Sequence, residues 1–239
     1  MTSDFFGAPE MPREFCARTG LPFKNMALLT RALTHRSYIN EHPETIEDNE
    51  RLEFLGDAIL DFLVGDWLYH HMPEMDEGRL TSLRSALVRN THLATFSRSL
   101  GLERALRLGH GEDESGGRRR DHILGSAFEA LVGALYIDQG LQAVKDFMHP
   151  LLEKAVHQIL RENLDRDPKS VFQELMQARG EGTPVYEVME ICGPDHARQY
   201  TVHTSINNVV YGRGTGPSKQ AASKAAARDA LERLKPSSC

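Results

Sequence analysis

The sequence predicts an all-α N-terminal domain followed by a small α+β domain with the element order α-β-β-β-α. Three observations lead to this fold class. Apolar residues recur at helical spacing from Phe15 to about Leu160. Residues 163–168 are rich in residues that favour a linker. Beyond them, residues 184–192 and 199–206 have the composition and partial alternation of β-strands.

Length and composition are those of a soluble globular protein. A chain of 239 residues is long enough for two modest domains, and we expect them at residues 1–163 and 169–239, joined by a linker at 164–168. Apolar residues make up 40% of the chain and charged residues 26%, which is ordinary for a soluble protein with a core. No apolar run is long enough for a membrane helix, and the first residues do not resemble a signal peptide. We therefore expect no membrane partner.

The cysteines bear on the cellular compartment, and the charge bears on the class of partner. Cys16, Cys192 and Cys239 are far apart and form no C-x-x-C pair, so we expect free thiols in a reducing compartment and a cytoplasmic location. The net charge of −6 argues weakly against a polyanionic partner. It is unevenly spread, because from Asp167 onward nine Lys and Arg face eight Asp and Glu. A nucleic-acid partner must therefore be argued from individual residues.

The N-terminal part is predicted to form helices over Met26–Thr34, Asn49–Tyr69, Leu80–Arg89, Thr91–Leu100, His122–Tyr136 and Leu141–Arg161. Met72-Pro73 ends the second helix, because proline stops helices, and Gly101 ends the fourth. Glu112–Arg120 is predicted as a polar loop. Its three consecutive arginines, 118–120, either contact phosphate or form a solvated run.

The helix that starts at Asn49 carries the most informative pattern. Glu50, Glu53 and Asp57 fall at i, i+3 and i+7, on one helical stripe. Like charges at this spacing destabilise a helix by about 0.2–0.5 kcal/mol per pair, and a cation would relieve the repulsion. Carboxylate oxygens suit Mg²⁺ better than Zn²⁺. A solvated acidic face explains the spacing equally well. A second stripe is expected to face the core: Leu52, Leu55, Ile59 and Phe62.

The C-terminal part begins with a short helix at Val171–Gln177, followed by the two strands named above. Asn207-Asn208 lies where a hairpin turn is expected, leading to a third strand at Val209–Gly212. An alanine-rich helix follows from Ser218, its predicted cap, to Leu234.

A phosphate-binding nucleotide loop is not expected in this part of the chain. Gly212, Gly214 and Gly216 precede Ser218-Lys219. A Walker loop needs lysine before serine or threonine, so the order here is reversed. We therefore expect no nucleotide cofactor.

These pieces, taken in order, resemble a known family. N-E-R-L-E-F-L-G-D-A-I-L at Asn49–Leu60, D-E-G-R-L at Asp76–Leu80 and A-F-E-A-L-V-G-A-L-Y-I-D at Ala127–Asp138 resemble the nuclease domain of ribonuclease III. D-P-K-S-V-F-Q-E-L-M-Q at Asp167–Gln177 and G-R-G-T-G-P-S-K at Gly212–Lys219 resemble the double-stranded RNA-binding domain that follows it in the bacterial enzymes. The resemblance covers nearly the whole chain.

The resemblance implies an endoribonuclease that cuts double-stranded RNA with Mg²⁺, or with Mn²⁺ in its place. Its products would carry 5′-phosphates and 3′-hydroxyls, and its work would be rRNA maturation and RNA turnover. Glu53, Asp57 and Glu129 match the catalytic, metal-binding carboxylates, and Glu50 and Glu77 match further acidic positions around the cleavage site. A paired core charge is the alternative for Glu129. An unpaired buried carboxylate is costly, which favours the ligand role.

One position departs from the family pattern. The family has an aspartate three residues before the glutamate that Glu129 matches, and here Ser126 stands at that position. We keep Ser126 in the expected metal site, but its hydroxyl is a poor, neutral ligand for Mg²⁺. We therefore expect weaker metal binding and reduced activity. The alternative is a double-stranded RNA-binding protein built on a catalytically weakened ribonuclease III scaffold.

The resemblance also implies a symmetric homodimer with the acidic helix at its interface. Phe54 matches an aromatic residue that family members insert into the partner. Gly56 costs about 1 kcal/mol of helix propensity, unless it permits the close approach of a second helix. We therefore expect Phe54 and Gly56 at the dimer interface.

Contacts with duplex RNA are expected from the C-terminal domain. Gln173, Gln177 and His196 match residues that reach the minor groove, where 2′-hydroxyls distinguish RNA from DNA. Ser218 and Lys219 begin a helix whose N-terminus would face a phosphate. Many members have a further lysine where this chain has Gln220, and Lys224 is expected to compensate in part.

Overall fold

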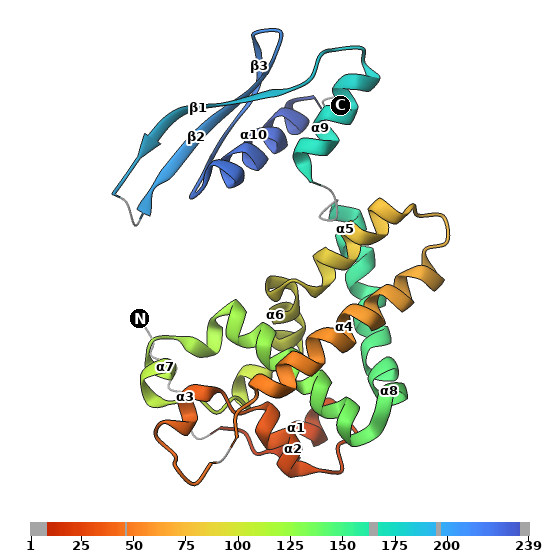
Figure 1. Cartoon of the computed structure of the whole chain (residues 1–239), viewed down its shortest axis with the longest axis vertical. Coiled ribbons are helices and arrows are strands. Elements are labelled where there is room, and N and C mark those ends of the chain that lie inside the picture. The colour runs from red at the N-terminus through yellow and green to blue at the C-terminus, as the bar shows by residue number, and fades with distance from the viewer. Residues whose placement is uncertain (1–8, 46, 163–166, 195–196, 235–239) are drawn as a thin grey trace. The chain divides into compact units, whose positions relative to one another are not determined.

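The chain folds into two compact units, Met1–Asp165 and Arg166–Cys239, which the computed structural model in Figure 1 shows in ribbon form. The described residues are 9–45, 47–162, 167–194 and 197–234. The first unit is helical, and the second carries a three-stranded sheet with two helices. The predicted fold class is therefore confirmed. No helix among the described residues is both long and apolar enough to cross a membrane.

The described part of the first unit consists of α-helices and short 3₁₀ helices: α1 Pro12–Thr19, α2 Met26–Ala32, α3 Arg36–Ile39, α4 Glu50–His71, α5 Glu77–Val88, α6 Asn90–Ser99, η1 Leu102–Arg104, α7 His110–Glu114, η2 Gly117–Arg119 and α8 Asp121–Glu162. The two long helices, α4 and α8, pack against each other, and α6 packs against α8 as well. Their buried side chains belong to one hydrophobic core.

Helix α4 buries one side and leaves another open. Leu52 and Ile59 are buried, as their spacing predicts, and Leu55 is partly buried against the same core. Phe62, expected in the core, is instead 56% exposed. It lies eight residues after Phe54 and seven before Tyr69, which are 81% and 72% exposed. This spacing puts the three rings on one side of the helix, away from the buried stripe, which is why the core prediction for Phe62 is wrong.

Helix α8 corresponds to two predicted helices joined end to end. Gly140 interrupts it with φ 81° and ψ 178°, a non-helical conformation. This break falls in the gap between the predicted helices at 122–136 and 141–161. Glycine adopts a positive φ without steric cost, so the chain changes direction here without a longer loop.

The predicted polar loop Glu112–Arg120 is more ordered than expected, because α7 and η2 occupy most of it. Arg118 is 4% exposed. Its Nε donates to Asp113 Oδ1 at 2.7 Å, and its Nη1 donates to the backbone oxygen of Leu106 at 2.6 Å. The phosphate-contact alternative for Arg118 is therefore wrong: this guanidinium ties the loop to the domain.

The second unit contains α9 Pro168–Ala178, β1 Val185–Cys192, β2 Gln199–Ile206, β3 Val209–Gly216 and α10 Lys219–Arg233. The strands are antiparallel in the order β1-β2-β3. Asn207 and Asn208 have φ of 49° and 64°, as a tight two-residue hairpin turn requires. Helices α9 and α10 pack against each other, and α10 packs on β2 and β3.

Strand β3 extends to Gly216, beyond the predicted end at Gly212. Glycine has low strand propensity, which hides such a segment from sequence analysis. The glycines are needed because α10 lies directly against this strand. A Cβ added to Gly214 would lie 2.1 Å from the backbone nitrogen of Ala226. The glycine row therefore serves helix packing.

Candidate active site

The two long helices of the first unit approach most closely where each has a glycine. A Cβ added to Gly56 of α4 would lie 1.8 Å from the backbone oxygen of Glu129 on α8. A Cβ added to Gly133 of α8 would lie 2.3 Å from the backbone oxygen of Leu52. No side chain fits at either position, so the helix backbones are nearly in contact.

This packing corrects the expectation for Gly56. The close approach that its missing side chain permits is made by α8 of the same chain, and Gly56 is buried there. It is therefore not open to a dimer partner, in contrast to the exposed Phe54 two residues earlier. The intrachain contact brings the carboxylates of α4 next to Glu129.

An acidic cavity of about 640 Å³ lies at this junction. It is lined by Glu50, Glu53, Phe54, Asp57, Val88, Arg89, Asn90 and Glu129. Glu53 and Asp57 of α4 and Glu129 of α8 thus share one cavity, and Glu50 lines it as well. Their assignment as metal ligands stays a prediction.

Glu129 is the most perturbed carboxyl group in this cavity. It is 8% exposed, and burial, followed by the charges of Asp57 and Glu53, raises its pKa from 4.5 to about 8. Both effects disfavour the carboxylate form. In the protein without a cation, Glu129 therefore holds a proton at neutral pH.

The donor chemistry of the cavity fits a hard divalent cation. Three carboxylates supply oxygen ligands, which Mg²⁺ and Mn²⁺ prefer. Burial and then repulsion raise the pKa of Glu129, and a cation would relieve the repulsion. Among the described residues no three His, Cys, Asp or Glu side chains form a ready-made metal cluster. The carboxylates line the cavity without meeting at one point.

Ser126 is oriented toward this group of acids. Its Oγ donates a hydrogen bond to Glu53 Oε1 at 2.9 Å, and so joins α8 to α4. A serine hydroxyl can donate to a carboxylate, whereas a second carboxylate at this position would repel Glu53. Ser126 thus contacts a predicted ligand directly, an interaction that the sequence did not indicate.

Two residues of the cavity were missed by sequence analysis. Arg89 and Asn90 lie at the corner between α5 and α6 and line the cavity beside the carboxylates. The sequence shows only a junction between two predicted helices, with no signal for which part of the domain that corner touches. Glu77, predicted near the site, is the first residue of α5, whose opposite end reaches the cavity. It is not among the lining residues.

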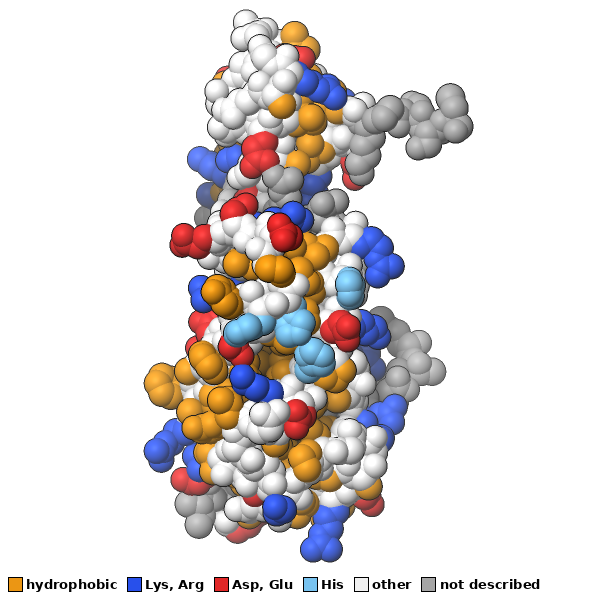
Figure 2. Space-filling model, turned by 90° about the vertical axis from the view of Figure 1, so that its right-hand side faces the viewer, with side chains coloured by type: hydrophobic (Ala, Val, Ile, Leu, Met, Phe, Trp, Pro, Cys, Tyr) orange, Lys and Arg blue, Asp and Glu red, His pale blue; other side chains and the backbone are white. Residues whose placement is uncertain are grey.

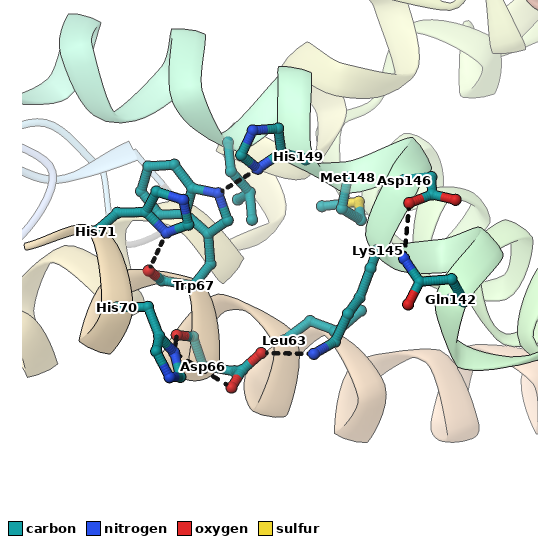
Figure 3. Close-up of a pocket in the computed structure, with 11 residues that line it drawn as sticks. Leu63, Asp66, Trp67, His70, His71, Gln142, Lys145, Asp146, Met148 and His149 are labelled. Carbon is teal, nitrogen blue, oxygen red and sulfur yellow. Dashed lines mark hydrogen bonds and ion pairs between the residues drawn. The ribbon is translucent and has the colours of Figure 1, made fainter.

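A second cavity, of about 400 Å³, lies farther along α4 and α8 and is lined by several histidines. Figure 2 shows histidine side chains gathered on one face of the molecule, and Figure 3 shows the cavity itself. Trp67 Nε1 donates to His149 Nδ1 at 2.9 Å, and Lys145 Nζ donates to Asp66 Oδ2 at 2.8 Å. His71 Nδ1 donates to the backbone oxygen of Trp67 at 2.8 Å. The polar groups of this cavity are largely paired with one another.

The hydrogen bond from Trp67 also fixes the tautomer of His149. Because Nδ1 accepts a hydrogen bond from the indole N–H, the neutral ring carries its own proton on Nε2. A histidine ligand instead usually donates its second ring N–H and binds metal through a bare nitrogen. The histidine cavity is therefore poorly suited to hold a metal through this ring.

The predicted RNA-binding residues of the second unit are partly accessible. Gln173 and Gln177 are exposed on α9. Ser218 caps α10, as predicted, because its Oγ accepts from the backbone nitrogen of Ala221 at 3.1 Å. Lys219 is exposed on the first turn of α10. His196 lies outside the described residues.

Lys224 differs from the other predicted RNA contacts. Its Nζ forms a salt bridge of 2.9 Å with Asp167 Oδ2. Lys224 lies four residues after Gln220, one turn along the same side of α10. Its partial compensation for Gln220 stays a prediction, and contact with RNA would require it to leave Asp167.

Comparisons with known proteins identify the family of each unit. A family model described as ribonuclease-III-like matches residues 25–155, and one described as a double-stranded RNA binding motif matches residues 168–234. Two proteins named Ribonuclease 3 are close relatives. The one from Pelotomaculum thermopropionicum is 45% identical over 90% of this chain and 89% of its own length. The one from Streptococcus gordonii is 44% identical over 90% and 93%.

A solved structure is also similar. The nuclease domain of ribonuclease III from Campylobacter jejuni matches with a TM-score of 0.54 and 37% identity, over 59% of this chain and 94% of that one. The sequence relatives, by contrast, align with both units of this chain. With two family models in the expected order and relatives at this level of identity, the chain belongs to the ribonuclease III family.

Proposed function

We propose that this chain hydrolyses phosphodiester bonds of double-stranded RNA with the help of a divalent cation, Mg²⁺ or alternatively Mn²⁺. The class of activity follows from the family, whose close members named Ribonuclease 3 align over 90% of the chain. The chain is thus a double-strand-specific endoribonuclease. The observation that supports the proposed site is that carboxylates from α4 and α8 line one cavity.

The residues have distinct roles in this proposal. Glu53, Asp57 and Glu129 would hold the cation, which supplies Lewis acidity and lowers the pKa of water. Ser126 orients Glu53 through its hydrogen bond. Glu129 would lose its proton on cation binding, because the positive charge would offset its burial and the charges of Asp57 and Glu53. The products would be 5′-phosphates and 3′-hydroxyls.

We further propose that the chain acts as a homodimer. Phe54, Phe62 and Tyr69 expose large apolar side chains along one side of α4, and such surfaces commonly mark protein interfaces. The Campylobacter jejuni relative has a region involved in dimer formation of its nuclease domain. A two-fold axis would supply two acidic cavities, one for each strand of a duplex.

The second unit would bring the duplex to the nuclease unit. Exposed Gln173 and Gln177 would reach the minor groove, and the first turn of α10, with Lys219, would face a phosphate. The matched double-stranded RNA binding motif supports this role. We propose rRNA maturation and RNA turnover in the cytoplasm as the setting.

A metal titration tests the proposal. A long RNA duplex is incubated with the full chain over a range of Mg²⁺ and of Mn²⁺ concentrations, with Asp57→Asn as the control. Metal-dependent cuts that are absent in the control support the proposal. Duplex binding without cuts at any concentration of either metal would refute it.

That second result would favour the alternative function, a double-stranded RNA-binding protein on a weakened scaffold. The observation in its favour is that Ser126, a neutral residue, stands in the cavity region where the family has an aspartate. The cleavage rates of Ser126→Asp and Ser126→Ala test how far Ser126 limits the activity. If Asp increases cleavage and lowers the metal requirement, Ser126 limits the activity. If Ala is slower than the native chain, its hydrogen bond to Glu53 contributes to the activity.

A further inference from the structure

Among the described residues that line the acidic cavity, Arg89 is a cation that forms no ion pair. It lies there together with Glu50, Glu53, Asp57 and Glu129, and its side chain is exposed. Its Nε donates to the backbone oxygen of Ala86 at 3.2 Å. Within the described ranges, its two terminal nitrogens have no hydrogen-bond or salt-bridge partner.

The terminal nitrogens of Arg89 lie at the rim of a cavity lined by carboxylates, yet they bind none of them. A carboxylate within reach would attract them, because charge-assisted hydrogen bonds are about twice as strong as neutral ones. The corner between α5 and α6 therefore keeps Arg89 at the cavity without letting it close on the acids. The donors remain available to a ligand that enters.

Packing fixes this corner in place. Asn90 lies against α8, where a Cβ added to Gly125 would be 2.8 Å from Asn90 Oδ1. At the far end of α6, Ser97 Oγ donates to the backbone oxygen of Leu124 on α8 at 2.6 Å. Helix α6 is thus attached to the same helix that carries Glu129. The start of α6, and Arg89 with it, is held at a fixed distance from the acids.

The chemistry of the donors identifies the ligand class. A guanidinium offers a planar fork of N–H donors that matches the oxygens of a carboxylate or a phosphate. In the proposed function the carboxylates of the cavity hold a cation, so the remaining anion is a phosphate of the RNA strand. We propose that Arg89 is a catalytic residue that binds the non-bridging oxygens of the phosphate that is cut.

This inference rests on the proposed function and adds a residue to it. When water attacks the phosphorus, negative charge grows on those oxygens, and donors placed in advance stabilise it. Arg89 forms no covalent bond and transfers no proton. The competing explanation is structural: Arg89 is present to bind the carbonyl of Ala86 at the end of α5.

The first test measures cleavage by the full chain in single-turnover conditions on a short duplex with one cleavage site. We expect Arg89→Gln to cut about 10²-fold more slowly, the usual cost of removing one donor to a developing oxyanion. Arg89→Lys should fall between this variant and the native chain, because it keeps the charge but loses the fork. The control is Arg104→Gln, which removes an exposed arginine of η1 outside the cavity lining and should cut normally.

The second test measures binding, with Ca²⁺ in place of Mg²⁺. Two duplexes are compared, one with the native phosphate and one with an uncharged methylphosphonate at the cleavage position. Both carry hydrogen in place of the adjacent 2′-hydroxyl. The native chain should bind the neutral duplex about tenfold more weakly, the order expected for losing one charge-assisted contact. Arg89→Gln should bind both duplexes equally.

The two tests separate the possible failures. Normal cleavage by Arg89→Gln, or equal sensitivity of this variant and the native chain to the methylphosphonate, would overturn the role of Arg89 while leaving the nuclease standing. Absence of cleavage by the native chain, together with the expected binding pattern, would overturn the nuclease and leave the phosphate contact intact. If Arg89→Gln fails to fold, Arg89→Lys provides both measurements.

Discussion

Helices α4 and α8 carry two cavities that differ in how their polar groups are paired. In the histidine cavity, Trp67 donates a hydrogen bond to His149, and Lys145 donates one to Asp66. In the acidic cavity, Glu129 lacks an ion-pair partner among the described residues, and so does Arg89. Buried polar groups are normally paired, because leaving them unpaired costs free energy. Pairing in the histidine cavity therefore points to a structural role, whereas the buried, unpaired Glu129 of the acidic cavity points to a ligand.

The largest expected effect comes from the acidic cavity. Glu129→Gln removes one proposed ligand and should slow cleavage of an RNA duplex about 10³-fold, since a metal ligand supports several kcal/mol of transition-state stabilisation. The matched control is Asp146→Asn in the histidine cavity, where Gln142 is bonded to this carboxylate at 2.8 Å. It should leave the rate unchanged. Equal losses in the two variants would remove the distinction between the cavities.

The acidic cavity should also make stability depend on pH. The pKa of Glu129 is about 8 in the folded chain against 4.5 for a free carboxyl. Its favourable contribution is therefore fully present below about pH 4.5 and is lost as pH rises to about 8. Without divalent ions, the free energy of unfolding should fall by roughly 1 kcal/mol per pH unit in this window.

Urea unfolding at a series of pH values measures this dependence. Glu129→Gln should flatten the curve between pH 5 and about 8, because the neutral amide does not titrate. A native chain whose stability is constant across this window would show that the burial of Glu129 has no such cost.

The glycine contact between the helices should have the next largest effect. In Gly56→Ala the new Cβ meets the backbone of Glu129, and overpacking of this kind costs about 1–3 kcal/mol. Gly65→Ala on the same helix is the control, because its nearest neighbour would be an Arg84 side-chain atom at 4.0 Å. It should stabilise the chain by about 0.5–1 kcal/mol. Thermal unfolding of both variants checks the opposite signs.

A substitution in the histidine cavity should lower the stability of the chain without changing its cleavage rate. Trp67→Phe removes the indole N–H that His149 accepts and should cost about 1 kcal/mol. Cleavage should be unchanged. Circular dichroism is the suitable probe of unfolding, because the variant has lost the single tryptophan of the chain. A large loss of cleavage by a variant that folds normally would give this cavity a role in the reaction.

The smallest expected effect concerns the second unit, where an unpaired lysine can be compared with a paired one. Lys219 has no salt-bridge partner among the described residues, whereas Lys224 is paired with Asp167. Lys219→Gln should lower the slope of log affinity against log salt for duplex RNA by about one unit. Lys224→Gln should leave the slope unchanged and cost less than about 1 kcal/mol of stability. The reverse result would make Lys224 the phosphate contact.

Much of the architecture was predictable from local pattern. The spacing of Leu52, Leu55 and Ile59 predicts the core face of α4, and Asn207-Asn208 predicts the hairpin turn. Phe62 and the end of β3 were misjudged because neither depends on local preference alone. Whether a ring on a helix is exposed depends on what else packs against that side of the helix. A glycine-rich strand depends on the helix that covers it.

The candidate site was predictable only in part. The acidic spacing on α4 identified Glu53 and Asp57 as a group, and the family resemblance added Glu129. Arg89 and the bond between Ser126 and Glu53 depend on how three helices meet. Tertiary contacts of this kind produce no periodic pattern in the sequence, so they could not be predicted from any single segment.

Gly140 has one more consequence, for changes in chain length. Its conformation, φ 81° and ψ 178°, resets the angular phase of α8. A residue inserted within an unbroken helix turns everything beyond it by about 100°. At Gly140 this break separates Ser126 and Glu129 from the second half of α8. A residue inserted there should therefore leave both side chains facing α4.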